Sequence, residues 1–240
     1  MQTRFVVNFD FRTKNDEIQF SEIINHFNFI IAQIDEFSKN KRDWYETGYS
    51  RKQALSQLAF RNGDILDNTR SKWERRYKKN NPLFVDGVWD ANDDAHCCGI
   101  SYRKMYYAEK NRASVEFTLV PDDEGDILSR FIVLISKLAS FFVCSYVNID
   151  SKGYSVLGRN VFPDRLHAGW MLFIPHTVLP ELIPEAAKVV PVVDNGRQKG
   201  TIIVSTEDVF DGDNPVHIAK ANDIEIRLLD LGFLPLMADL

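Results

Sequence analysis

The sequence predicts an α+β fold in which a mostly antiparallel β-sheet is packed with helices. Runs of alternating apolar and polar residues indicate strands, and apolar residues spaced three and four apart indicate helices. The two kinds of element follow one another in mixed order, without the regular alternation of a parallel α/β sheet. The chain has 240 residues, of which 45% are hydrophobic, enough to bury a sizeable core. We expect one domain over residues 1–240, and the clearest place for a break between two sub-lobes is the Asn-Asn-Pro segment at residues 80–82.

The first third of the chain carries a strand pattern followed by helical patterns. Phe5, Val7, Phe9 and Phe11 alternate with more polar residues, and a helical apolar spacing runs from Ile23 to Phe37. From these patterns we expect a strand at Thr3–Phe11, a helix ending near Phe37, a turn-like segment at Trp44–Ser50, a short helix at Arg51–Leu58 and a polar helix at residues 65–80.

The rest of the chain is predicted to contain most of the sheet. We expect strands at Phe84–Trp89, Gly99–Tyr107, Ala113–Val120, Ser145–Ile149 and Ala168–Ile174, a hairpin at Val189–Ser205 that turns at Asn195-Gly196, and a last helix from Pro215 to Leu231. A further helix, at residues 126–143, is apolar on nearly every side. We therefore expect that helix to lie deep in the core.

Composition and charge narrow the class of protein. The net charge is −5, which argues against nucleic acid as the main ligand. Residues 1–79 have a balance of +4 and residues 80–240 a balance of −9, so the acidic excess lies in the last two-thirds of the chain. The three cysteines are odd in number, and two of them, Cys97 and Cys98, are adjacent, which is not a disulfide framework.

The sequence shows no segment that targets or spans a membrane. The first ten residues lack the apolar region and small-residue cleavage site of a secretory signal. The longest apolar stretch, Phe131–Val143, is interrupted by Lys137 and is too short to cross a bilayer. We expect a cytoplasmic protein with no membrane contact, and a monomer.

One pattern resembles the metal site of restriction-type nucleases. Pro121-Asp122 is followed by Asp150-Ser151-Lys152, and in such enzymes carboxylates hold a divalent metal while a lysine assists the attacking water. Asp122, however, stands in a Pro-Asp-Asp-Glu-Gly turn, where acids are expected in any case. A metal-dependent nuclease is therefore the alternative interpretation.

Other catalytic and metal-binding patterns are absent from the sequence. The segment from Asp93 to Cys98 contains the residue types that bind zinc, but it has no C-x-x-C pair and no second His/Cys cluster. There is no Gly-x-Ser-x-Gly elbow and no phosphate-binding glycine loop. We expect no catalytic residues, no bound metal and no cofactor, and hence a protein that is not an enzyme.

The basic run Arg70–Lys79 has two interpretations. Its interleaved Trp73 and Tyr77 would suit a nucleic-acid contact. The same spacing suits a solvent-exposed helix that packs an aromatic stripe of Leu66, Trp73 and Tyr77 inward. We favour the second interpretation because the whole chain is acidic.

Acidic residues gather in loops and could together mimic a phosphate backbone. Four acids fall within seven residues from Glu207 to Asp213, more than one helix cap requires, although Asp213 is a candidate for that cap. Acids also crowd the turn that follows Pro121. The residues that we predict to bind a partner are Glu207, Asp208, Asp211, Asp122, Asp123 and Glu124, with the aromatic Trp89 as a further contact.

Two segments resemble the immunity protein 52 family, which is found beside polymorphic and type VI secretion toxins. The first runs from Asp43 to Leu55, with Trp44 and Gly48 ahead of a short helix. The second, His167–Pro175, contains Gly169-Trp170 on a strand followed by a proline. We expect Gly169-Trp170 to pack the sheet, and Trp44 is equally well explained as core or as interface.

The resemblance implies an α+β inhibitor. Such a protein binds and neutralises a cognate secreted antibacterial toxin, typically a nuclease with a restriction-endonuclease fold. It would act without a cofactor by stoichiometric binding, and acidic loops would be steered to the basic substrate groove of the nuclease.

Overall fold

The computed structural model describes residues 3–13, 17–93, 96–107, 110–121, 125–151 and 153–240. The fold is α+β, as predicted, and every strand pair with a defined register is antiparallel. The chain divides into two compact units. The first unit holds residues 12–123, and the second holds residues 3–11 and 124–240. The Asn-Asn-Pro segment at 80–82 lies within the first unit, between a helix and a strand.

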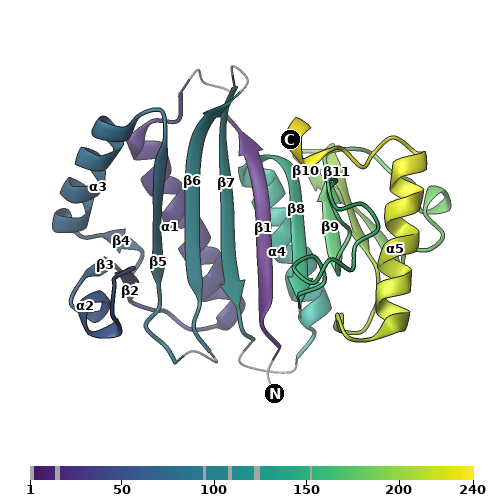
Figure 1. Cartoon of the computed structure of the whole chain (residues 1–240), viewed down its shortest axis with the longest axis horizontal. Helices are drawn as coiled ribbons and strands as arrows, with labels where there is room; N and C mark the ends of the chain where they lie inside the picture. The colour runs from purple at the N-terminus through teal and green to yellow at the C-terminus, as the bar shows by residue number, and fades with distance from the viewer. Residues whose placement is uncertain (1–2, 14–16, 94–95, 108–109, 122–124, 152) are drawn as a thin grey trace. The chain divides into compact units, whose positions relative to one another are not determined.

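The first unit packs three helices with strands in the order β7-β6-β5-β2-β3-β4. Its elements are α1 (Phe20–Ser38), β2 (Trp44–Glu46), α2 (Arg51–Leu55), β3 (Leu58–Arg61), β4 (Asp64–Ile65), α3 (Asp67–Asn80), β5 (Phe84–Trp89), β6 (Gly99–Tyr107) and β7 (Lys110–Leu119). Figure 1 shows α1 behind the sheet and α3 beside β5. A capping box between Gln19 and Glu22 begins α1, and Lys39 in the left-handed region ends it.

An aromatic cluster forms the core of the first unit. Phe27 of α1 stacks against Phe60 at 5.7 Å and meets the ring of Trp73 at 4.9 Å between centroids. Trp73 also contacts Phe84 edge to face at 6.1 Å. The predicted inward stripe of the basic helix is therefore confirmed at Trp73 and Tyr77, both buried. Trp73 joins α3 to α1 and to the sheet.

The second unit has strands in the order β10-β11-β9-β8-β1. Its elements are β1 (Phe5–Arg12), α4 (Ile127–Phe141), β8 (Val143–Ser151), β9 (Met171–Ile174), the 3-10 helix η1 (Pro180–Leu182), β10 (Lys188–Asp194), β11 (Arg197–Val204), α5 (Pro215–Asp230) and the 3-10 helix η2 (Met237–Asp239). The hairpin of β10 and β11 turns at Asn195-Gly196, as predicted, with both residues at positive φ. Figure 1 shows α4 behind β8 and α5 to the right of β9.

Helix α4 is buried along one face only, which corrects the expectation that it lies deep in the core. Phe131, Leu134 and Leu138 are at most 3% exposed, whereas Val133 and Phe141 are 51% and 48% exposed. An apolar sequence on every side therefore did not mean burial on every side. The outward apolar residues remain in contact with solvent in this unit.

Three short strands of the first unit were not predicted from the sequence. Trp44–Glu46, taken there as part of a turn, is β2, and β3 and β4 follow it in the same sheet. They contain two to four residues each, too few for an alternating pattern to be recognised. Within the described residues, no helix is both long enough and apolar enough to span a membrane.

Candidate partner-binding surface

The predicted acidic loop joins β11 to α5 in the second unit. Glu207 and Asp208 are exposed. Asp213 forms an ion pair with Arg159, with 2.8 Å between Nη2 and Oδ1, and Glu207 lies 3.8 Å from the Lys188 ammonium. These two ion pairs neutralise part of the negative charge of the loop. The exposed carboxylates of Asp208 and Glu207 carry most of the negative charge that faces solvent. The acid of each pair is exposed, at 68% for Asp213 and 69% for Glu207, so each pair contributes little stability.

Internal hydrogen bonds fix the shape of this acidic loop. The Thr206 hydroxyl donates to the carbonyl of Asp208 at 2.8 Å, and the amide of Asp211 donates to Nδ1 of His217 at 2.9 Å. Asn214, not Asp213, caps α5, because its side chain accepts from the amide of Val216 at 2.9 Å. The acids of the loop are therefore not needed for the cap.

The other predicted partner-binding residues are distributed differently. Asp122, Asp123 and Glu124 lie outside the described residues. Trp89 ends β5 in the first unit, where its Nε1 donates to the carbonyl of Glu46 at 3.3 Å. The guanidinium of Arg51 lies 5.3 Å from the centre of its ring, so Trp89 is already in contact with a cation.

A second loop, residues 153–159, exposes apolar side chains that the sequence analysis did not single out. Val156 is 88% exposed and Leu157 is 58% exposed. Val216, in the first turn of α5 next to the acidic loop, is 60% exposed. These residues belong to no periodic apolar pattern in the sequence. Their exposure depends on which other residues pack against them in the folded chain.

Two contacts connect the 153–159 loop to the acidic loop, and a third comes from Ser151, just before it. Arg159 pairs with Asp213, as described above. The Ser151 hydroxyl, at the end of β8, donates to the carbonyl of Phe210 at 2.5 Å. The ring of Tyr154 packs edge to face against Phe210 at 5.5 Å. Exposed acidic and exposed apolar groups therefore adjoin on one surface of the second unit.

In the second unit, Gly169 and Trp170, on which part of the motif resemblance rests, have structural roles. Gly169 has a φ of +56°, and a Cβ there would lie 3.0 Å from the carbonyl oxygen of Ile149. Trp170 is fully buried, stacks on Phe5 at 5.3 Å and donates from Nε1 to the carbonyl of Thr206 at 3.0 Å. The expectation that Gly169-Trp170 packs on the sheet is confirmed. The two residues do not lie on the expected strand but in a bend before β9, because the positive φ of Gly169 is incompatible with an extended strand. Through Thr206, Trp170 also anchors the start of the acidic loop.

In the first unit, the segment from Trp44 to Leu55, on which the rest of the motif resemblance depends, packs around α2. Trp44 is fully buried in β2 and therefore belongs to the core. Gly48 is exposed, and a Cβ there would lie 3.1 Å from the amide nitrogen of Ala54. Ser50 caps α2 by accepting from the amide of Gln53 at 3.3 Å. The segment packs closely on the helix that follows it.

Asp150, a residue of the nuclease-like pattern, supports a loop. It is 4% exposed, and its carboxylate accepts hydrogen bonds from the amide of Ser151 at 2.7 Å and from the amide and hydroxyl of Ser155 at 3.1 and 2.9 Å. The other two residues of the pattern, Asp122 and Lys152, lie outside the described residues. The contacts of Asp150 thus explain its burial without a metal ion.

The zinc-like segment is not assembled into a metal centre in the described part of the chain. Among those residues, no three or more His, Cys, Asp or Glu side chains group closely enough to hold an ion. His96 pairs with Asp93 at 2.7 Å on the surface. Burial raises the pKa of the Cys98 thiol to about 11, so this thiol is neutral at physiological pH.

Two cations of the basic helix α3 already have protein partners. Lys72 forms an ion pair with Glu46, and Arg76 forms one with Asp86. Burial raises the pKa of Asp86, while its hydrogen bond with Arg76 opposes that shift. The basic run therefore joins α3 to β2 and β5 and is only partly available to an outside ligand.

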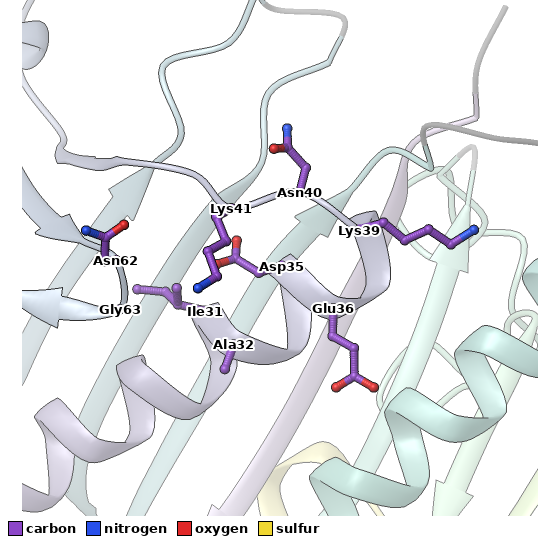
Figure 2. A pocket seen from close by; sticks show the side chains of 9 residues that line it. All are labelled: Ile31, Ala32, Asp35, Glu36, Lys39, Asn40, Lys41, Asn62 and Gly63. Carbon is purple, nitrogen blue, oxygen red and sulfur yellow. The ribbon is translucent and has the colours of Figure 1, made fainter.

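The first unit also has a shallow hollow of about 440 Å³ at the end of α1. Figure 2 shows its lining, which consists of Ile31, Ala32, Asp35, Glu36, Lys39, Asn40, Lys41, Asn62 and Gly63. Asp35 points toward Lys41, whereas Glu36 points away on the other side of the helix. Burial raises the pKa of Asp35 to about 6, and the nearby charges of Arg42 and Lys41 oppose this shift. Of the predicted partner-binding residues that the structure describes, Glu207, Asp208, Asp211 and Trp89, none lines this hollow.

Comparison with known proteins identifies a fold but not a family. No protein-family model matches the sequence, and no curated protein matches it. The Pseudomonas aeruginosa T6SS protein PA0821 aligns over 85% of this chain and 68% of its own, with 8% identity and a TM-score of 0.50. This similarity indicates a shared fold. The Trypanosoma brucei AdoMetDC-delta26 monomer aligns over 84% of this chain and 63% of its own at 8% identity, but its TM-score of 0.19 is too low to support an argument.

Proposed function

We propose that this chain is an immunity protein of a type VI secretion system, one that binds and neutralises a cognate antibacterial effector without being an enzyme itself. The fold that it shares with a T6SS protein over 85% of its length is the observation that carries the proposal. The motif resemblance at Trp44, Gly48, Gly169 and Trp170 points the same way. Because these four residues pack within their own units, we assign them a structural role. The loops are then the part of the chain that would contact a partner.

The geometry of the second unit suits a protein partner. An acidic loop lies next to exposed valine and leucine side chains, and a mixed apolar and charged surface is typical of protein–protein interfaces. A nuclease effector presents a basic groove for its substrate. Acidic side chains on the inhibitor would accelerate the encounter with that groove and favour the correct partner over others.

The test uses the secreted protein encoded by the neighbouring gene as the candidate effector. Co-expression with the wild-type chain should restore growth to cells that produce it, and the two purified proteins should form a one-to-one complex. Reversing the loop charges by Glu207→Lys, Asp208→Lys and Asp211→Lys should weaken both effects. Glu207 and Asp208 are exposed and contribute little stability. Asp211 is half-buried and accepts a hydrogen bond from the amide of Asp213 at 3.0 Å, so we expect a modest decrease in melting temperature without loss of the fold. Asp213 is retained because it holds Arg159.

A matched control separates local contact from net charge. Reversal of Asp164, Glu181 and Asp230, three exposed acids elsewhere in the second unit, changes the total charge by the same amount and should leave protection intact. Equal losses in the two triple variants would show that only overall charge matters. Metal-dependent DNA cleavage by the chain alone, abolished by Asp150→Ala, would replace the proposal with the nuclease interpretation.

A further inference from the structure

The 153–159 loop exposes apolar side chains on a backbone held by internal hydrogen bonds. The amide of Leu157 donates to the carbonyl of Gly153 at 2.8 Å, and the amide of Arg159 donates to the carbonyl of Tyr154 at 3.1 Å. Gly153 and Gly158 take φ values of +70° and +64°, which permit the two sharp turns at its ends. Exposed valine and leucine side chains held in this way have no evident role within the unit.

The base of the loop is fixed from the inside. Asp150 accepts from the amide and the hydroxyl of Ser155, as described above. The Tyr154 hydroxyl lies 2.6 Å from Oδ1 of Asn222 and 2.9 Å from Oε1 of the buried Glu225, both on α5. These contacts place the two side chains that follow, Val156 and Leu157, on a defined support. A preorganised loop loses little conformational entropy when a partner covers it.

We propose that Val156 and Leu157 are the apolar anchors of the partner interface, with the acidic loop as its charged rim; this rests on the proposed function. The occupant is a protein surface with an apolar pocket bordered by lysine or arginine side chains. Charge complementarity supports this choice, because Glu207 and Asp208 are exposed acids. The ion pair between Arg159 and Asp213 links the loop that carries the anchors to the loop that carries these acids. Interfaces commonly place apolar anchors at the centre and charges at the rim.

The two parts of the surface should have different kinetic effects. Rim charges act mainly on the association rate, through long-range attraction. Anchors that become fully covered act mainly on the dissociation rate. The double variant Val156→Ser/Leu157→Ser should therefore raise koff by about tenfold or more, with kon changed by less than about threefold.

The experiment is surface plasmon resonance with the purified effector encoded by the neighbouring gene. The control is Val193→Ser/Leu179→Ser, because these side chains are 58% and 57% exposed in the same unit, outside both loops. The control should change koff by less than about twofold. Melting temperatures of both variants should match the wild type, because all four side chains are exposed.

The outcomes distinguish the inference from the function on which it rests. If the wild-type chain binds the effector and the anchor variant dissociates at the wild-type rate, the anchors are wrong and the proposed function stands. If both double variants dissociate faster by the same factor, the effect is not specific to the loop and the anchors are again wrong. If the wild-type chain does not bind the effector at all, both the anchors and the proposed function are wrong.

Discussion

Two charged side chains, Lys104 and Glu225, are fully buried, one in each unit, and each is held by several polar partners. The Lys104 ammonium lies 3.0 Å from a Glu17 oxygen and 2.8 Å from Oδ1 of Asn81, and it also lies 4.5 Å from the centre of the Tyr77 ring. The hydrogen bond from Lys104 is the main cause of the lowered pKa of Glu17. Burial raises the pKa of Glu225, against three hydrogen bonds that favour its charged form. Partners of this kind make a buried charge tolerable.

Asp35 offers a pH test at the scale of one residue. Its pKa of about 6 in the folded protein is above the ordinary 3.8, so between pH 4 and 6 the folded state binds more protons than the unfolded state. The free energy of unfolding contributed by this group therefore falls as pH rises through that window. Asp35→Asn should stabilise the protein by about 1 kcal/mol at pH 7.5, a value reduced because the carboxyl is only partly buried, and by nothing below about pH 4.

Urea unfolding of both proteins across pH 3.5–8 measures this difference. Glu36→Gln is the control, since Glu36 is exposed on the same turn of α1 and should change stability by less than about 0.5 kcal/mol at every pH. A pH-independent effect of Asp35→Asn would show that the carboxyl has the same pKa in the folded and unfolded states, which would contradict the raised pKa.

At the scale of an element, α4 buries one face and exposes the apolar side chains of Val133 and Phe141 on the other. Leu134 and Val133 are neighbours in sequence, yet they are 3% and 51% exposed. Phe131 of the inner face packs on Phe5 of β1 at 4.8 Å and meets the ring of Trp170 at 5.5 Å. These contacts connect α4 to both β1 and the Gly-Trp segment.

Substitutions in α4 should separate its two faces. Leu134→Ala removes buried methyl groups and leaves a cavity, so it should lower the free energy of unfolding by about 2–5 kcal/mol. Val133→Ala should change it by less than about 0.5 kcal/mol, because that side chain is already half in solvent. Chemical denaturation measures both. Similar losses for the two variants would contradict the assignment of the faces.

At the scale of the whole molecule, charge is unevenly placed along the chain. The net charge is −5, and the excess of acids falls after residue 80. In the first unit, basic residues of α3 pair with Glu46 and Asp86. In the second unit, exposed acids remain on the loop before α5. The surface suited to a basic partner is therefore in the second unit.

Salt should reveal this charge in the kinetics of binding. Raising ionic strength from about 50 mM to 500 mM shortens the range of electrostatic attraction, so kon for the effector should fall by about tenfold while koff changes little. The triple variant at Glu207, Asp208 and Asp211 should show a much smaller decrease. Stopped-flow association measurements check this, and a salt-independent kon for the wild-type chain would contradict electrostatic steering.

Local pattern in the sequence was enough to determine the long elements. Strands Phe84–Trp89 and Gly99–Tyr107, the Asn195-Gly196 hairpin and the helix that begins at Pro215 were predicted at or near their observed bounds. In each case residues close in sequence carry the signal, through alternation, turn chemistry or a helix start. The acidic loop was located for the same reason, because its composition is visible in seven consecutive residues.

Tertiary structure decided what is exposed and what is joined. Only the folded chain shows that Asp150 supports a loop, that the Arg159–Asp213 ion pair links the 153–159 loop to the acidic loop, and that one face of α4 is uncovered. It also shows that the two- to four-residue strands β2, β3 and β4 belong to a sheet. Exposure and long-range pairing depend on residues distant in sequence, and no local window of the sequence contains them.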